Sequence, residues 1–261
     1  MPSSQEDIAA SLAAYRSFIA AQNRRVLDVY VPFIATAEPD ELEDDEDLNE
    51  LRLEALGSLL DTTLADFGVS EPNEVLTCYD ELAPKIGADG TYVMHEGSHE
   101  EREAKRREYL DEIEKNLKLK SREDVRETIS IPEDFRTLAG LVDGVLGYGI
   151  PFWRNTTQPA FWWGFMTPEE LEEYAGLGSS WKIAGGWTPG TGPDANFSIL
   201  YCRQCDEDAW QWRYTLCTAV DGEHIFETTP DFLAWYTHFG EDDEVPDPKD
   251  LNANRVLGCD F

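Results

Sequence analysis

The chain has 261 residues, of which 41% are hydrophobic and 11% aromatic, so it is long enough to build one large domain or two small ones around a real core. Its 53 acidic and 21 basic residues give a net charge of −32. A body this negative repels nucleic-acid phosphates and anionic lipid surfaces and attracts basic partners. The same charge also serves solubility alone, so it excludes partners better than it identifies one.

The N-terminal segment carries Glu6 and Asp7 and lacks the apolar stretch of a signal peptide. The sequence contains no run of about 18 apolar residues, so no transmembrane helix is expected. The cysteines are odd in number and scattered, which favours a reducing compartment over a disulfide framework: Cys78, Cys202, Cys205, Cys217 and Cys259. We therefore expect a cytoplasmic protein.

The N-terminal third is predicted to be helical. Six apolar residues spaced three, four or seven apart form one stripe on a long amphipathic helix: Ile8, Leu12, Tyr15, Ile19, Val26 and Tyr30. Pro32 and the segment 37–40 are expected to break it. A second stripe runs from Leu48 to Phe67 and is expected to stop at Gly68. A shorter third helix is predicted over 73–82, and the three helices either form a small bundle or pack on the C-terminal region.

Residues 84–98 contain three glycines and predict a loop. From Glu100 to Lys120 charges of both signs surround a narrow apolar stripe, which predicts one exposed bridging helix. The tripeptide Lys105-Arg106-Arg107 resembles a short nuclear localisation signal, so a nuclear location is an alternative. The solvated face of a helix is the favoured interpretation of the same residues.

The C-terminal half is rich in aromatic residues, and all eight tryptophans lie between Trp153 and Trp235. A helix is predicted to open at Pro132 and to close near Asp143-Gly144. Thr167-Pro168-Glu169-Glu170 is expected to open a shorter helix that continues through Tyr174.

Alternation of apolar and polar residues predicts two half-buried strands. The first ends just before residues 205–208, and the second begins just after them. A four-residue turn at 205–208 places Tyr201, Ile199 and Phe197 opposite three residues of the second strand: Trp212, Tyr214 and Leu216. A five-residue turn would mix the apolar and polar faces, because one step of slip reverses every side chain. We therefore predict the four-residue turn.

Asp221-Gly222 predicts a tight two-residue hairpin that returns the chain as a third antiparallel strand through His224, Ile225 and Phe226. Thr229 is expected to cap a final helix with Pro230 in its first turn. Antiparallel strands and helices segregated along the chain predict the α+β class: an antiparallel sheet packed by helices and preceded by an N-terminal helical region. The predicted regions are 1–83 (helical), 84–122 (loop and bridging helix), 123–240 (α+β domain) and 241–261 (acidic tail).

His95-Glu96-Gly97-Ser98-His99 matches H-E-x-x-H, which on a helix presents two imidazoles to zinc and a glutamate to activate water. A helix of that kind lies at the base of a cleft, whereas residues 100–103 are all charged and strongly solvated. Gly97 and Ser98 are also poor helix formers. A solvent-exposed loop that enters a helix is the favoured interpretation, and no metal is expected.

Four residues of types that bind metals occur in this part of the sequence: Cys202 and Cys205 of the segment Cys202-Arg-Gln-Cys205, Cys217 and His224. The first pair straddles the end of a predicted strand, and Cys217 lies inside the next one, so ordinary strand cysteines are favoured over a zinc or redox site. The glycines between 185 and 192 are not followed by the Gly-Lys-Ser/Thr of a phosphate-binding loop.

Binding energy at protein interfaces concentrates on aromatic anchors. Aromatic density peaks between Phe152 and Trp187, which predicts a partner site in this segment with Trp163 and Trp187 as candidate exposed anchors. The alternative is that these indoles fill the core.

Two short motifs between about Glu123 and Gly240 resemble the SUKH superfamily, the Smi/Knr type of cell-wall regulators and toxin-immunity proteins. Ile131-Pro132-Glu-Asp-Phe135, Leu138 and Asp143-Gly144 resemble its entry motif. Phe226, Thr229, Phe232 and Leu233 are similar to its closing helix. The segment 153–181 departs from the family's spacing, and the N-terminal helices match no family core. The resemblance implies an α+β domain that binds other proteins and carries over no catalytic residue.

Charge and resemblance together predict a non-catalytic intracellular interaction module, regulatory or immunity-type, that needs no cofactor. Its expected partner is another protein with a basic face. Binding to nucleic acid or to a membrane is not expected. The alternative is a zinc-dependent hydrolase that uses His95, Glu96 and His99.

Overall fold

The computed structural model describes residues 3–40, 47–93, 98–146, 150, 161, 164–174, 177–178, 180–191, 195–205, 208–218, 222–239 and 245–258. The chain forms two compact units that interleave along the sequence. The first, here the sheet unit, comprises Met1–Tyr15, Tyr92–Leu146 and Asn155–Thr237. The second, here the helical unit, comprises Arg16–Thr91, Gly147–Arg154 and His238–Phe261. These boundaries differ from the contiguous ranges predicted above, because the first 15 residues and the bridging helix belong with the sheet.

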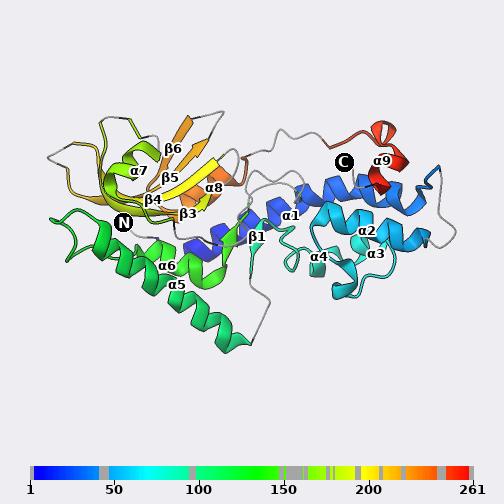
Figure 1. Cartoon of the computed structure of the whole chain (residues 1–261), viewed down its shortest axis with the longest axis horizontal. Helices are drawn as coiled ribbons and strands as arrows, with labels where there is room; N and C mark the ends of the chain where they lie inside the picture. Colours follow the sequence, from blue (N-terminus) through cyan, green and yellow to red (C-terminus); the bar gives the residue numbers. More distant parts are fainter. Residues whose placement is uncertain are drawn as a thin grey trace. The chain divides into compact units, whose positions relative to one another are not determined.

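Helix α1 (Gln5–Thr36) begins in the sheet unit and continues into the helical unit. The other elements of the sheet unit are labelled in Figure 1 where space allows: β1 (Thr91–Tyr92, at the boundary), α5 (His99–Lys120), α6 (Glu133–Leu141), β2 (Gly144–Val145), α7 (Pro168–Tyr174), β3 (Lys182–Thr191), β4 (Ala195–Arg203), β5 (Gln211–Thr218), β6 (Gly222–Phe226) and α8 (Thr229–Tyr236).

The main sheet is antiparallel with the strand order β3-β4-β5-β6, and β1 pairs with β2 in a separate two-stranded sheet. The predicted register of β4 and β5 is confirmed, with the pairs Phe197↔Leu216, Ile199↔Tyr214 and Tyr201↔Trp212. The turn between them is closed by a hydrogen bond from the Asp208 N–H to the Cys205 carbonyl. The α+β class follows from this sheet and the helices that cover it.

Each face of the main sheet packs on helices. On one face Ile199 and Tyr214 lie with Trp187, whose ring meets Phe135 of α6 edge to face at 5.3 Å. On the opposite face a second cluster packs Leu171 of α7 on the strands. Because both faces are covered, the sheet carries apolar side chains in both directions.

Helix α5 is the predicted bridging helix, and its apolar stripe is buried at Tyr109, Ile113 and Leu117. It begins with a capping box in which the side chains of Ser98 and Glu101 bond each other's backbone N–H groups. Helix α6 begins after Pro132, as predicted.

Arg106 links α5 to the end of α6. Its Nε lies 2.7 Å from Oδ1 of Asp143 and its Nη2 3.2 Å from Oδ2 of the same residue. The Asp143 side chain is 9% exposed. This bidentate pair draws the middle residue of the basic tripeptide 105–107 into a structural contact.

Two local predictions near the last strand are wrong by a small shift. Gly222 has the expected positive φ of 78°, but it pairs with Thr218, so three residues lie between the paired positions instead of a two-residue turn. The cap of α8 is Thr228, whose hydroxyl accepts from the Asp231 N–H at 3.2 Å. Thr229 is the first helical residue and is fully buried. By contrast, the Thr167–Glu170 cap of α7 forms as predicted.

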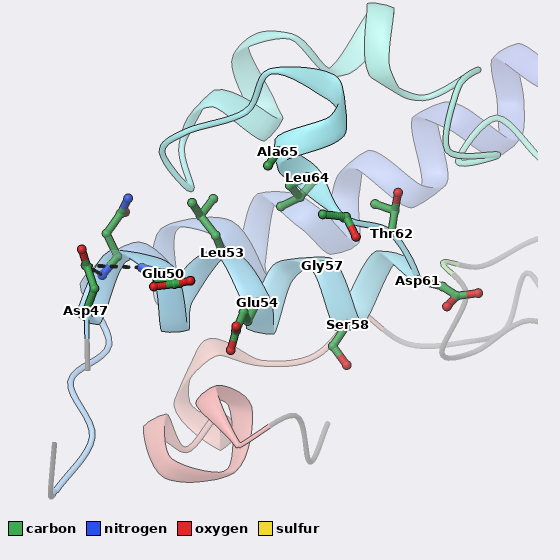
Figure 2. A pocket seen from close by; sticks show the side chains of 12 residues that line it. Asp47, Glu50, Leu53, Glu54, Gly57, Ser58, Asp61, Thr62, Leu64 and Ala65 are labelled. Atoms are coloured by element: carbon green, nitrogen blue, oxygen red, sulfur yellow. Dashed lines mark hydrogen bonds between the residues drawn. The ribbon is translucent and has the colours of Figure 1, made fainter. Parts of the chain in front are cut away.

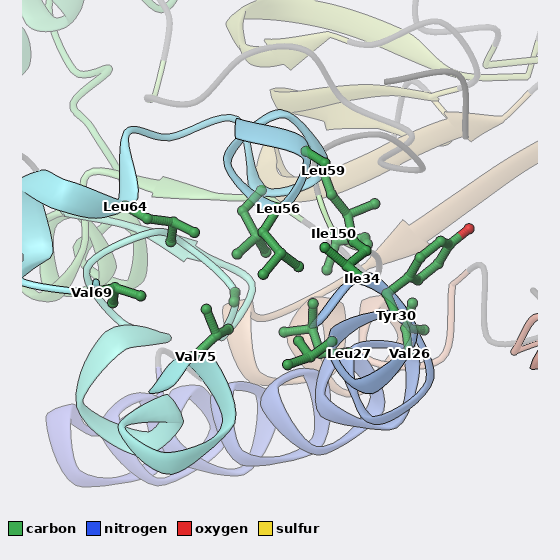
Figure 3. Packing of buried hydrophobic residues seen from close by; sticks show 14 of the residues in the cluster. Val26, Leu27, Tyr30, Ile34, Leu56, Leu59, Leu64, Val69, Val75 and Ile150 are labelled. Atoms are coloured by element: carbon green, nitrogen blue, oxygen red, sulfur yellow. The ribbon is translucent and has the colours of Figure 1, made fainter. Parts of the chain in front are cut away.

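In the described residues of the helical unit, the rest of α1 is followed by α2 (Leu48–Leu60), η1 (Leu64–Phe67), α3 (Glu74–Thr77), α4 (Tyr79–Leu82), η3 (Pro248–Asp250) and α9 (Ala253–Leu257). Figure 3 shows the core that α1 and α2 build together, with Leu27 and Ile34 facing Leu56 and Leu59. Val256 and Leu257 of α9 belong to the same cluster. These helices therefore form a packed unit of their own.

Pro32 lies inside α1 and does not end it, contrary to prediction. A proline inside a helix loses one backbone hydrogen bond and costs about 3 kcal/mol. The residues around it offset this loss, because Tyr30, Val31 and Ile34 are all buried in the core. The helix ends at Thr36, where the predicted second breaker begins.

The second predicted helix is two elements, because the chain turns after Leu60. Asp61 adopts the left-handed conformation with φ of 50°, and the Thr62 N–H bonds the Gly57 carbonyl at 2.9 Å. A Cβ at Gly57 would lie 2.6 Å from the Thr62 carbonyl oxygen, so only glycine permits this turn. Element η1 then ends at Gly68, as predicted. The third predicted helix is likewise divided into α3 and α4, around Cys78.

Among the helices of the described residues, none is long and apolar enough to cross a membrane.

Candidate functional site

A groove of about 670 Å³ lies along α2 and the turn that leads into η1, within the helical unit. Four carboxylates line it: Asp47, Glu50, Glu54 and Asp61. Figure 2 shows Asp47 and Asp61 at the two ends of α2, with Glu50 and Glu54 between them. We call it the α2 groove.

The local sequence explains this arrangement. Asp47, Glu50, Glu54 and Asp61 are separated by three, four and seven residues, so they share one face of a helix. The remaining face carries residues of the helical core. Asp47 is the N-cap, and its Oδ1 accepts from the Asn49 N–H at 2.8 Å. The buried face thus orients the acidic face toward solvent.

The carboxylates of the α2 groove are exposed, and among the residues described by the structure none of them forms an ion pair. Glu50 and Glu54 are one helical turn apart, a spacing at which like charges repel by a few tenths of a kcal/mol. Asp61 stands at the C-terminal end of α2, where the helix dipole disfavours a negative charge. A bound cationic group would relieve both effects.

Apolar groups complete the groove. Leu53 is half-buried, Leu64 is buried and Ala65 is exposed. A lysine or arginine side chain combines an aliphatic stem with a charged head, and it fits a surface that offers carboxylates beside leucines. This chemistry supports binding of a basic side chain.

The H-E-x-x-H motif does not lie on one helix. Helix α5 begins at His99, and Ser98 has an extended backbone with φ of −70° and ψ of 165°. Two histidines four residues apart share a face only within a continuous helix, so the geometry of a zinc helix is not formed. His95 and Glu96 lie outside the described residues. In the part of the chain that is described, no three His, Cys, Asp or Glu side chains are grouped to hold a metal ion.

The expectation that Trp187 presents an exposed indole is wrong. Its side chain is 0% exposed and packs between Phe135 and Trp212, with ring centroids 5.3 and 5.8 Å away. The pairing of β3 with β4 directs it to the sheet face that helices cover. It therefore belongs to the core, as in the alternative interpretation. Trp163 lies outside the described residues.

Cys202 and Cys217 occupy ordinary strand positions, and Cys205 lies in the turn that follows β4. Cys202 is opposite Gln211 in the β4–β5 ladder, and Cys217 lies six residues further along β5, a separation of about 20 Å. Burial raises the pKa of the Cys202 thiol to about 12, which keeps it protonated and unreactive. These residues do not converge on a metal.

Sequence reasoning missed the α2 groove, although its carboxylate spacing was readable. The sequence pattern did not predict the turn at Asp61, which brings Leu64 and Ala65 beside α2.

No family model matches this chain, and no curated protein or solved structure shows significant similarity to it.

Proposed function

We propose that this protein is a non-catalytic intracellular interaction module that binds a basic face of another protein, and that the α2 groove is the docking site. The observation that carries the proposal is the set of four exposed carboxylates beside Leu53, Leu64 and Ala65, on a chain with a net charge of −32. The resemblance of residues 123–240 to the SUKH superfamily supports the functional class, regulatory or immunity-type. The groove itself lies outside that segment.

Electrostatics predicts how such a partner associates. Complementary charges accelerate encounter and fix orientation, and their long-range part is screened beyond about 8 Å at physiological salt. The apolar residues of the groove supply the part of the affinity that salt does not screen. Binding should therefore weaken with salt without vanishing.

The experiment uses a fluorescently labelled amphipathic helical peptide of lysine and leucine, with binding followed by anisotropy. The groove variant combines Glu50→Gln with Glu54→Gln. The control combines Glu169→Gln with Glu173→Gln, which removes the same charge at the same four-residue spacing from α7, where both residues are exposed.

Exposed ion pairs contribute about 0.2–1 kcal/mol each, so the groove variant should bind the peptide about fivefold more weakly than the native protein. The control should change affinity less than twofold. Equal losses in the two variants would show that the peptide senses only the overall charge, and the assignment to the α2 groove would then be wrong.

A further inference from the structure

The main sheet has two edge strands among the described residues, β3 and β6, and their outer sides differ. An edge strand presents backbone groups that pair readily with another chain, so proteins usually cover or interrupt it. On β3 the Ala184 carbonyl accepts from the Arg122 N–H at 2.8 Å. Thr188 exchanges two hydrogen bonds of 3.1 Å with Gly164. The strand also contains Pro189 and two register shifts, so the β3 edge is both covered and interrupted.

Strand β6 carries none of these features. Its five residues, 222–226, include no lysine or proline and pair with β5 without a register shift. Within the described part of the chain, they form no backbone–backbone hydrogen bond outside the ladder with β5. In an antiparallel ladder, alternate residues direct their N–H and C=O groups away from the neighbouring strand. Strand β6 therefore offers an open edge about 17 Å long, which we call the β6 edge.

One face beside the β6 edge is acidic. Glu223 and Ile225 share this face, since side chains alternate along a strand. Glu223 is exposed and forms no ion pair with any residue that the structure describes. Glu227 continues the alternation beyond the end of the strand, where its contact with Arg213 is 3.5 Å long and its side chain is 74% exposed. A strand added to this edge would meet two carboxylates on this face.

The opposite face beside the β6 edge is aromatic. His224 and Phe226 are half-buried there. Trp235 of α8 packs on both rings, with centroids 4.2 and 5.8 Å away. Trp235 is itself half-buried, so it retains exposed surface next to β6. Tryptophan is enriched among the residues that anchor protein interfaces, and this face suits apolar side chains.

We infer that the β6 edge binds an extended segment of another protein by strand addition, and that this segment alternates basic and apolar residues. In such complexes backbone hydrogen bonds supply affinity and alternate side chains supply specificity. Basic residues pair with Glu223 and Glu227, and apolar residues pack on the aromatic face. A second copy of this chain is a poor occupant, because each copy carries a net charge of −32. The inference does not rest on the α2 groove, which belongs to the helical unit.

The test measures binding of a fluorescently labelled peptide, Lys-Val-Thr-Val-Lys, to the full chain by anisotropy. Its sequence reads the same in both directions, so its match to the edge does not depend on strand orientation. Two further peptides carry backbone N-methyl groups, one at both lysines and the other at both valines. Alternate residues of a strand form hydrogen bonds on opposite sides, so one methylated peptide loses its bonds to β6 and the other keeps them.

Three protein variants locate the binding. Glu223→Lys reverses the charge at the β6 edge, and Glu108→Lys makes the same change at an exposed position on α5. The third variant combines Glu50→Gln with Glu54→Gln in the α2 groove. Thermal melting of Glu223→Lys checks that its fold is intact.

We expect one methylated peptide to bind about tenfold more weakly than the parent peptide, and the other to bind within about twofold of it. Glu223→Lys should weaken binding of the parent about fivefold, and the other two variants should change it less than twofold. Equal affinity of the two methylated peptides, or absence of saturable binding, overturns strand addition. An equal loss in Glu108→Lys or in the groove variant overturns the placement at β6. Sedimentation velocity should find a monomer, whereas a dimer that the peptide dissociates would assign the edge to a second copy and overturn the inference.

Discussion

Replacement of Trp187 by alanine should strongly destabilise the sheet unit. An indole buries about 150–250 Å², which at about 25 cal/mol per Å² corresponds to about 4–6 kcal/mol of transfer free energy. An alanine retains part of this, and measured losses for buried tryptophan are about 3–5 kcal/mol. The side chain is fully buried against Phe135 and Trp212, so the full range applies.

For a protein of this size each kcal/mol shifts the melting temperature by about 2–4 °C. Trp187→Ala should therefore lower it by about 6–20 °C. Circular dichroism at 222 nm is the assay, because it does not depend on the fluorescence of the missing indole. Trp210→Ala, at a partly exposed tryptophan, should have a smaller effect. A Trp187→Ala protein that melts within about 2 °C of the native one would refute the assignment of this indole to the core.

Three further outcomes are expected. Asp61→Gly should stabilise the protein by about 1 kcal/mol in urea unfolding, because glycine adopts the left-handed conformation at φ of 50° without strain; a loss of stability would mean that the carboxylate itself caps α2. The pKa of Glu101 is lowered below 4.5 by hydrogen bonds from the backbone and then the side chain of Ser98, so its contribution to stability is present above pH 4.5 and is lost as the pH falls through the lowered pKa. Glu101→Gln should therefore reduce the difference in melting temperature between pH 7 and pH 3. Burial raises the pKa of Cys202 to about 12, whereas Cys205 is exposed; iodoacetamide at pH 8 should modify Cys205 and reach Cys202 only after denaturation, and mass spectrometry distinguishes the two sites.

The sheet was predictable because its information is local. The alternation of Ile199 with Tyr201, and of Trp212 with Tyr214, specifies which face is apolar, and the acidic turn between the strands allows only one register that keeps the faces separate. The six-residue stripe of α1 is buried for a similar reason, since helical periodicity is readable within a single segment.

Predictions that depended on single breaker residues were less successful. Pro32 normally interrupts a helix, but buried neighbours hold it within α1. Asp61 carries no obvious stop signal, yet the close approach of Thr62 to Gly57 turns the chain there. At Pro32 packing between distant segments outweighs a local preference, and that packing energy is not encoded within a short window of sequence. At Asp61 the turn rests on a local contact, the hydrogen bond from the Thr62 N–H to the Gly57 carbonyl.

The sequence by itself determined the α+β class, the pairing of β4 with β5 and the acidic character of the chain, because these follow from periodicity and composition. Only the tertiary structure decided which residues form sites. It buried Trp187, began α5 at His99 after an extended Ser98, and placed η1 beside α2 to form the α2 groove. A binding site consists of side chains that converge in space, and that convergence depends on turns and packing whose free energies are contributed by the whole fold.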